Sequence, residues 1–270
     1  ELEVLENSAL EDIALVSAVI DASATLGVSF ALDDFGTGYS SLTYLKRLPA
    51  QVLKIDQSFV RDMLQDSDDL AILEGILGLA TAFRRTAIAE GVETVAHGET
   101  LLRLGCDLGQ GYGIARPMAA ADLPAWRQRW RPDPRWAHAH CLDRELMPVL
   151  IAGVEHRGWI VALGEHLDGR RDAPPPLDHH QCRFGQWLDK TIHQPRHAAT
   201  FATIETLHLR VHALAADLLK RRSQGHDVEA LAGMAELHAL WDALLVHLEY
   251  LLKDDPRSLA PSSGGGSNCR

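Results

Sequence analysis

The 270-residue sequence predicts an α/β fold in its first half and an all-α fold in its second half. In the first half, short apolar runs alternate with amphipathic helical stretches, as in parallel βα units, where each crossover carries a helix. In the second half, long stretches have apolar residues at helical spacing. Between the halves, the segment WRQRWRPDPRW at 126–136 is rich in arginine and contains two prolines, which indicates a helix end or a linker.

The strands expected in the first half are short and apolar. They lie at 2–5, 28–33, 52–55, 87–90 and in a short run near Leu108. Helical segments such as 12–26 and 69–83 separate them. About five βα units of this kind predict an incomplete (β/α)₈, TIM-like barrel, because a complete barrel takes about 250 residues. Roughly the first three units would then precede residue 1, and the sheet would have an unpaired edge without them.

The second half predicts an antiparallel four-helix bundle. Its helical stretches are 145–168, 198–222 and 228–253, with a short helix after Cys182 and a break at PPPLD, 174–178. The end of the chain, SSGGGSNCR, has the composition of a flexible tail. We therefore expect four parts. They are a barrel segment at 1–135, a linker at 136–146, a helical bundle at 147–255 and a tail at 256–270.

Composition excludes several classes of function. A net charge of −11 argues against binding of bulk nucleic acid, which requires many Lys and Arg contacts to phosphates. The apolar stretch 237–252 is interrupted by polar residues, so no transmembrane segment is expected. The first residues, ELEVLE, lack the basic and then apolar regions of a secretory signal. Four cysteines scattered over two domains do not indicate a disulfide framework, and they favour a cytoplasmic location.

Polar residues occur where the expected strands end, which is the face of such barrels that carries out chemistry. They are Glu3, Asp33, Asp34, Lys54, Glu90 and Gln110. Asp33 and Asp34 close an apolar strand, and Gly36 and Gly38 then allow the backbone to turn tightly. Two adjacent carboxylates repel each other, and a pair of hard cations would relieve that repulsion. Each residue alone fits a turn, a strand end or a surface position, but their joint occurrence favours a metal site.

Over about residues 1–120 the sequence resembles the EAL family of cyclic di-GMP phosphodiesterases. The motifs that carry the resemblance are ELEVLE at 1–6, DDFGTGYSSL at 33–42, LKIDQSFV at 53–60, AEGVET at 89–94 and QGYGIARPM at 110–118. They occur in the order and at the spacing typical of the family. The Glu-Ala-Leu motif and a metal-binding asparagine of the family would lie upstream of residue 1.

The resemblance implies a site for two divalent cations, Mg²⁺ or Mn²⁺. Its ligands in this sequence would be Glu3, Asp33 and Asp34. Glu6 would steady the loop that follows the two aspartates. Two such ions suit phosphodiester hydrolysis, because they lower the pKa of water and neutralise charge on the phosphate.

The resemblance also implies catalytic roles for Lys54, Glu90, Glu93 and Gln110. Lys54 would position the attacking water, and Glu90 would assist that water at the metal site. Glu93 would support the site, and Gln110 would help to complete it. The implied reaction converts cyclic di-GMP and water into linear pGpG.

A second group of candidate ligands lies in the helical half. His208 and His212 are four residues apart in TLHLRVHAL, so both imidazoles project from one face of a helix. Cys182 precedes FGQWL, and His156 lies on an earlier helix near Trp159. One thiolate and three imidazoles form a suitable tetrahedral set for Zn²⁺. The alternative is that these histidines are ordinary residues of amphipathic helices and Cys182 a small buried apolar residue.

Two other histidine pairs are less suited to a metal site. His193 and His197 are also four apart, but Pro195 between them disfavours a regular helix. His179 and His180 are adjacent, so both imidazoles do not easily point at one ion. We interpret these four histidines as uninvolved.

The stretch from His156 to about residue 253 resembles the chemoreceptor zinc-binding domain, CZB. The resemblance rests on HRGWIVAL at 156–163, QCRFGQWL at 181–188 and FATIETLHLRVH at 201–212. It implies that the zinc ligands are His156, Cys182, His208 and His212. Domains of this family sense zinc or oxidants and are often dimeric, so the resemblance also implies a homodimer.

Together the two resemblances predict a cyclic di-GMP phosphodiesterase whose output depends on zinc or redox state in the helical domain. The alternative is a receptor that binds cyclic di-GMP without cleaving it and uses the helical domain as a sensor and interaction surface. A nucleic-acid role rests only on the Arg and Trp cluster at 126–136, which fits the last barrel helix equally well.

Overall fold

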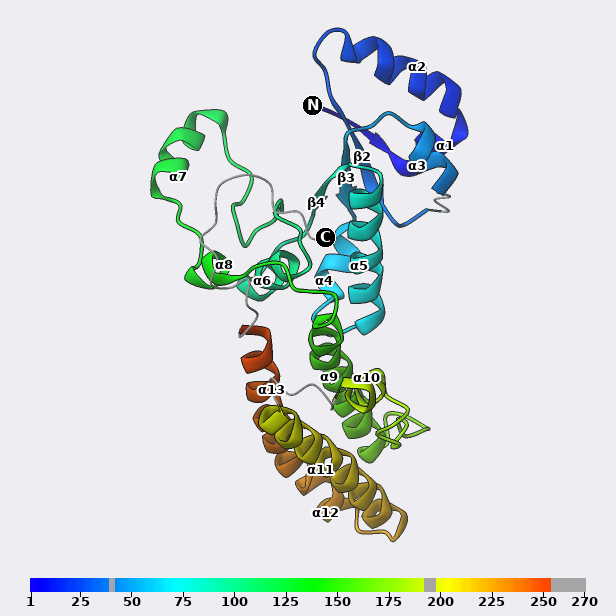
Figure 1. Cartoon of the computed structure of the whole chain (residues 1–270), viewed down its shortest axis with the longest axis vertical. Helices are drawn as coiled ribbons and strands as arrows, with labels where there is room; N and C mark the ends of the chain where they lie inside the picture. Colours follow the sequence, from blue (N-terminus) through cyan, green and yellow to red (C-terminus); the bar gives the residue numbers. More distant parts are fainter. Residues whose placement is uncertain (39–41, 192–197, 254–270) are drawn as a thin grey trace. The chain divides into compact units, whose positions relative to one another are not determined.

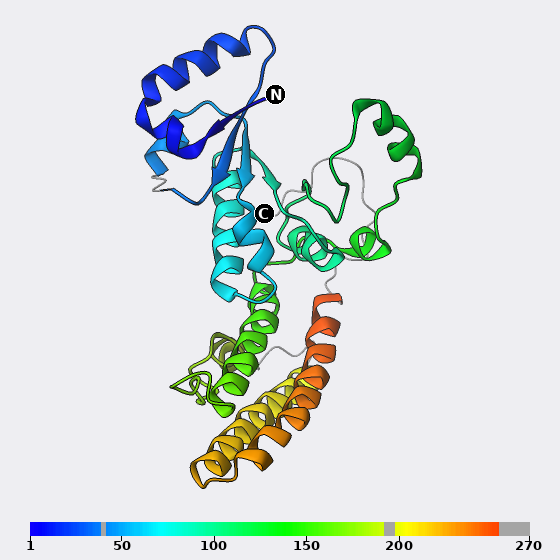
Figure 2. The ribbon, with the colours of Figure 1, turned by 180° about the vertical axis from the view of Figure 1, so that it is seen from behind.

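The computed structural model describes residues 1–38, 42–191 and 198–253. These residues form two compact units, one comprising Glu1–Cys141 and the other beginning at Leu142 (Figures 1 and 2). Each unit has its own hydrophobic core. None of the helices among the described residues is both long enough and apolar enough to cross a bilayer.

The first unit contains a parallel sheet of four strands in the order β1-β2-β3-β4. Its strands are β1 (Leu2–Leu5), β2 (Phe30–Phe35), β3 (Val52–Ile55) and β4 (Thr86–Ala89). A single parallel bridge between Ala89 and Gly109 lies where a fifth strand was expected near Leu108. The expected α/β class is confirmed, with β2 shifted two residues later and β4 one residue earlier than the apolar runs indicated.

Helices connect the strands of the first unit. They are α1 (Glu6–Glu11), α2 (Ile13–Ala24), α3 (Leu42–Arg47), α4 (Gln57–Asp62), α5 (Ser67–Ala82) and α6 (Val95–Arg103). The longest, α5, begins where the Asp66 side chain accepts a hydrogen bond from the Asp68 amide. It buries Leu70, Leu73 and Ile76, because these residues recur at a spacing of three.

The arginine-rich segment, expected as a helix end or a linker, spans the end of one short helix and the start of another. A 3₁₀ turn (Ala120–Asp122) leads into α7 (Leu123–Arg129), and α8 (Pro134–His138) follows. Both helices have proline in the first turn, where no amide donor is needed. Trp136 attaches α8 to α6, since its indole Nε1 donates to the Val95 carbonyl oxygen at 2.8 Å.

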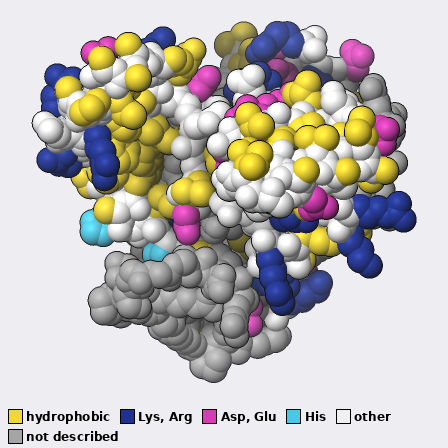
Figure 3. Space-filling view, turned by 90° about the horizontal axis from the view of Figure 1, so that it is seen from above, with side chains coloured by type: hydrophobic (Ala, Val, Ile, Leu, Met, Phe, Trp, Pro, Cys, Tyr) yellow, Lys and Arg dark blue, Asp and Glu magenta, His cyan; other side chains and the backbone are white. Residues whose placement is uncertain are grey.

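On the face seen in Figure 3, hydrophobic side chains are interspersed with charged ones.

Arg85 secures the loop between α3 and β3. Its guanidinium donates to three carbonyl oxygens, that of Leu45 in α3 and those of Leu48 and Ala50 in the loop. Burial lowers the pKa of Arg85. The loop leads directly into β3, so this contact helps to set the position at which β3 enters the sheet.

The second unit is all-helical, as expected. Its helices are α9 (Met147–Leu167), α10 (Arg183–Thr191), α11 (Ala198–Ser223), α12 (Asp227–Ala232) and α13 (Met234–Lys253). The three long helices α9, α11 and α13 contact one another around a core that includes Leu163, Ile204 and Leu244. The stretch 228–253 was expected as one helix, but Gly233 separates α12 from α13. A side chain at Gly233 would collide with the side chain of Leu218, so the close approach to α11 accounts for glycine there.

Replacing Arg85 with leucine should destabilise the first unit by about 2–4 kcal/mol, because three carbonyl oxygens lose their donor at once. Urea unfolding followed by circular dichroism measures this change. The matched control is Arg84→Leu, since Arg84 is exposed and lies one residue earlier. Equal unfolding midpoints for the two variants would contradict the role given to Arg85.

Candidate functional sites

Lys54 lies at the centre of the polar residues that end the strands of the first unit. It comes from β3 and is buried, and its Nζ is 2.8 Å from Glu3 Oε1 and 2.8 Å from Asp33 Oδ1. The same Nζ lies 2.7 Å from Glu90 Oε1, just after β4. Burial lowers the pKa of Lys54, but hydrogen bonds to Asp33, Glu3 and Glu90 outweigh burial and raise it overall. Lys54 therefore keeps its proton at neutral pH.

Asp33, Asp34 and Glu90 bring three carboxylates together. One oxygen from each lies within 4.8 Å of the others. Adjacent strand residues normally face opposite sides of a sheet, but Asp34 has φ of +54° and the β2–β3 register shifts between Leu32 and Phe35. This local distortion turns both aspartates toward one site.

The donors of this cluster suit a hard divalent cation. Burial raises the pKa of Asp34, and the nearby charges of Asp33 and Asp56 raise it further. A divalent cation would relieve this repulsion, and carboxylate oxygens are the ligands that Mg²⁺ and Mn²⁺ prefer. The chemistry of the three carboxylates therefore fits the expected metal. Glu3 lies beside them through its ion pair with Lys54 and is not part of the compact three-residue group.

Glu6 holds the loop after the two aspartates. It is buried, and its Oε2 accepts a hydrogen bond from the Gly36 amide at 2.8 Å. Gly36 has φ of +105°, a conformation that favours glycine. A side chain at Gly38 would collide with the Glu6 carboxylate and with Asn7. The two glycines of DDFGTG thus allow the loop to close over Glu6.

A pocket of about 520 Å³ adjoins the carboxylates. Its walls include Glu90, Glu93 and Gln110, and the Gln110 amide Nε2 donates to Glu90 Oε1. Glu93 lies in the pocket wall and outside the three-carboxylate group. Two further wall residues, Tyr112 and Arg116, were not identified from sequence, although both lie within QGYGIARPM. The Arg116 guanidinium lies 4.6 Å from the centre of the Tyr112 ring, where it presents positive charge to the pocket.

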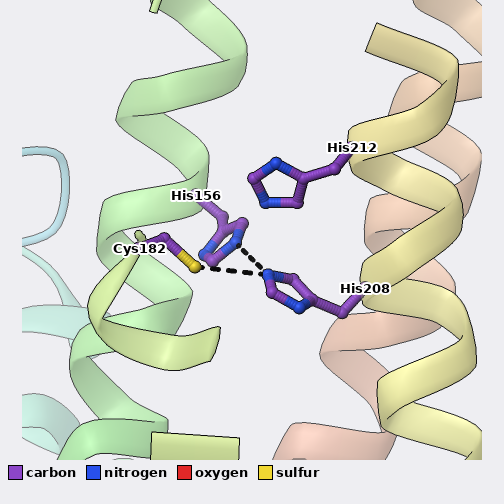
Figure 4. Close-up of side chains that lie close together, drawn as sticks. All are labelled: His156, Cys182, His208 and His212. Atoms are coloured by element: carbon purple, nitrogen blue, oxygen red, sulfur yellow. Dashed lines mark hydrogen bonds between the residues drawn. The ribbon is translucent and has the colours of Figure 1, made fainter. Parts of the chain in front are cut away.

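The second unit brings together the Cys and His residues selected from sequence (Figure 4). His156 comes from α9, Cys182 from the residue before α10, and His208 and His212 from α11. One potential ligand atom from each lies within 4.8 Å of all the others. His208 Nε2 is 3.1 Å from His156 Nε2 and 3.4 Å from Cys182 Sγ.

These separations match the edges of a zinc tetrahedron. With Zn–N of about 2.05 Å and Zn–S of about 2.3 Å, tetrahedral angles place two nitrogens about 3.3 Å apart and nitrogen and sulfur about 3.6 Å apart. The distances around His208 Nε2 are within about 0.2 Å of these values.

Hydrogen bonds at the outer nitrogens orient two of the imidazoles. His156 Nδ1 lies 3.1 Å from the Ala152 carbonyl oxygen, and His212 Nδ1 lies 2.8 Å from the Leu177 carbonyl oxygen. A carbonyl oxygen only accepts, so each Nδ1 carries the proton and each Nε2 keeps a lone pair that faces inward. His212 Nε2 is buried and has no hydrogen-bond partner among the described residues. A metal ion would satisfy it.

The protonation of the cluster also suits a metal. Burial and the neighbouring imidazoles lower the pKa of His156 to about 4 and that of His208 to about 2. Burial also lowers the pKa of His212. All three rings are therefore neutral at pH 7, the form that binds metal. Burial raises the pKa of Cys182, so metal binding at this site would displace the thiol proton.

Aromatic residues surround the imidazoles. Trp241 of α13 stacks on His156, with ring centres 5.2 Å apart and ring planes 12° apart. The Trp159 ring lies 4.9 Å from the His212 ring, and its Nε1 donates to the Pro176 carbonyl oxygen. Sequence spacing did not identify Trp241, because apolar periodicity on α13 does not distinguish a residue beside the cluster from any other core residue.

The histidines interpreted as uninvolved differ in position. His193 and His197 lie outside the described residues. His180 is exposed, and its Nδ1 lies 2.9 Å from Asp189 Oδ2. His179 is partly buried, and its ring centre is 6.1 Å from that of His208 and 6.2 Å from that of His212. His179 therefore lies at the edge of the cluster.

Comparison with known proteins relates both units to described families. A family model described as EAL domain matches residues 1–117, and one described as chemoreceptor zinc-binding domain matches residues 156–219. The bifunctional diguanylate cyclase/cyclic di-GMP phosphodiesterase MucR of Pseudomonas aeruginosa is 48% identical over 124 residues, covering 46% of this chain and 18% of MucR. Cyclic di-GMP phosphodiesterase NbdA of the same organism is 40% identical over 133 residues, covering 49% of this chain and 17% of NbdA.

The chain thus spans less than a fifth of the length of either relative. Among solved structures, the EAL domain of Mycobacterium smegmatis DcpA is 39% identical, with a TM-score of 0.45 over 48% of this chain and 58% of that one. Residues 1–117 are thus similar to EAL domains, and residues 156–219 are similar to chemoreceptor zinc-binding domains.

Proposed function

We propose that the first unit belongs to a metal-dependent phosphodiesterase that hydrolyses cyclic di-GMP to pGpG, and that zinc in the second unit regulates it. The observation that carries this proposal is the convergence of Glu3, Asp33 and Glu90 on Lys54 beside a fourth carboxylate, Asp34. Relatives named as cyclic di-GMP phosphodiesterases support the choice of substrate.

The residues of the first unit would divide the work of hydrolysis. Asp33 and Asp34 would hold Mg²⁺ or Mn²⁺ beside Glu90 of the same three-carboxylate group. Glu3, which is linked to Asp33 through Lys54, would be a further ligand. Bound divalent ions would supply Lewis-acid activation of water and neutralise charge on the phosphodiester. Lys54, which keeps its proton, would donate a hydrogen bond that orients the attacking water.

The remaining site residues would act on the proton and the substrate. Glu90, held by the Gln110 amide, would accept a proton from the attacking water. Glu93 would support the wall beside it, and Arg116 would contact the anionic substrate in the pocket. Breaking one of the two phosphodiester bonds of the ring would yield linear pGpG.

In the second unit, His156, Cys182, His208 and His212 would hold Zn²⁺. These ligands come from the helices α9 and α11 and from the segment before α10. Zinc would therefore link three segments that are far apart in sequence. Loss of zinc or oxidation of Cys182 would break the link between these segments, and this change is the proposed regulatory signal. We assign the barrel to residues 1–135, the linker to 136–146, the zinc domain to 147–255 and the tail to 256–270, and we propose a homodimer.

The phosphodiesterase proposal is tested with the chain extended upstream through a complete barrel. With Mg²⁺ or Mn²⁺ present, Glu90→Gln should lower kcat for pGpG formation by about 10²–10⁴-fold, because a proton acceptor is lost. Asp21→Asn is the control, since Asp21 is an exposed carboxylate on α2. Wild-type protein that binds cyclic di-GMP without cleaving it would instead be a receptor.

The zinc proposal is tested by metal content and affinity. The chain should bind one Zn²⁺ per molecule, and His212→Gln should weaken binding by about 100-fold or more, since His212 Nε2 has no other partner among the described residues. His226→Gln, on an exposed residue of the same unit, is the control. Competition with a chromophoric chelator measures both. Equal affinities for the two variants would reject the assigned site.

The position of Cys182 depends on Gly185, whose amide donates to Cys182 Sγ at 3.1 Å. A side chain at Gly185 would collide with the His179 carbonyl oxygen. Gly185→Ala should therefore weaken zinc binding about tenfold or more. Gly153→Ala is the matched control, because the added carbon would meet only Leu245, at 3.8 Å. If Gly185→Ala keeps wild-type zinc affinity, Cys182 does not require this backbone geometry.

A further inference from the structure

The Cys and His cluster of the second unit is closed on one side and open on the other. His156, His208 and His212 are each less than 5% exposed, whereas Cys182 is only partly buried. His179 is also partly buried, and it lies three residues before Cys182 in the chain. The two are joined directly, since Cys182 Sγ donates to the His179 carbonyl oxygen at 3.3 Å.

The His179 ring lies close to the position of a metal ligand. A metal-bound imidazole has its ring centre about 3.2 Å from the ion, so two ligand rings at tetrahedral angles have centres about 5 Å apart. Within the cluster, the three ring-centre separations are 4.7, 5.1 and 5.7 Å. His179 is 6.1 Å from His208 and 6.2 Å from His212, about 1 Å farther than this geometry requires. Rotation of one side chain between staggered rotamers covers such a distance.

His180 provides a contrast within the same segment. Its Nδ1 already lies 2.9 Å from Asp189 Oδ2, and the side chain is exposed. Its ring centre lies 3.9 Å from that of His179, with the ring planes tilted by 41°. Of these two adjacent imidazoles, only His179 faces the rings of the cluster at near-ligand distance.

We infer that His179 is a reserve metal ligand, which binds the ion in the second unit when the thiolate of Cys182 is absent. The inference rests on the proposed zinc site. When the Cys182 sulfur leaves the ion, it takes up a proton, and a neutral nitrogen of His179 donates its lone pair instead. The ion then has four imidazole ligands, and the net charge of the site rises by one. Four imidazoles remain a suitable set for Zn²⁺ or Co²⁺.

The test uses Co²⁺ as a spectroscopic probe of the 270-residue chain. Cys182→Ser keeps the size of the side chain and its hydrogen bonds, but it removes the thiolate. This variant should still bind one Co²⁺ with tetrahedral ligand-field absorption, while the sulfur-to-cobalt charge-transfer band disappears. Adding His179→Gln should then weaken binding about tenfold or more. Adding His180→Gln instead should change it by less than about twofold. Cys182→Ala serves in place of Cys182→Ser if the serine variant is not helical by circular dichroism.

Three results would overturn the inference. They are complete loss of Co²⁺ from folded Cys182→Ser and Cys182→Ala, equal affinity with and without His179, and equal losses from the His179 and His180 changes. Failure of the wild-type chain to bind either Co²⁺ or Zn²⁺ would reject the zinc proposal itself. The two failures are therefore distinguishable.

Discussion

The first unit depends on the parallel pairing of its four neighbouring strands, β1, β2, β3 and β4. Parallel strands end at the same edge of a sheet, so residues that are far apart in sequence meet there without any contact between their neighbours in the chain. Glu3 of β1 and Asp33 of β2 contact Lys54 of β3 from one side of that strand, and Glu90, which follows β4, contacts it from the other side. The carboxylates of Glu3, Asp33 and Glu90 would repel one another if no positive charge lay between them. The buried ammonium of Lys54 offsets three of these negative charges, and the chemistry of the remaining carboxylates suits a cation.

In the second unit the main constraint is the burial of three imidazoles, those of His156, His208 and His212, in a hydrophobic core. Buried polar groups are costly unless they have partners. Carbonyl oxygens of Ala152 and Leu177 satisfy the outer nitrogens of His156 and His212, so the remaining lone pairs point toward one another. Such an arrangement is unfavourable without an ion and favourable with one. His212 Nε2, which is buried without a hydrogen-bond partner in the described part of the chain, is therefore the feature of this unit that most directly indicates a ligand.

Backbone geometry matters at both centres because it brings side chains to places that regular structure would not. A positive φ at Asp34 turns adjacent carboxylates to one side of β2. At Cys182, the amide of Gly185 and the carbonyl of His179 both contact the sulfur. Each centre thus combines ligands on regular elements, which position them rigidly, with one irregular segment that completes the set.

Apolar periodicity in the sequence by itself determined the fold class, the bounds of β1 and β3, and the existence and approximate extent of α9 and α11, because burial of one face leaves a regular pattern along the chain. The motifs also predicted which polar residues belong together at each centre. Only the tertiary structure decided that Lys54 contacts three carboxylates, that His212 Nε2 lacks a partner among the residues described, and that Trp241 stacks on His156. It also decided that Gly233 divides the last helical stretch. These features depend on distances between elements, and no local pattern of residues records such distances.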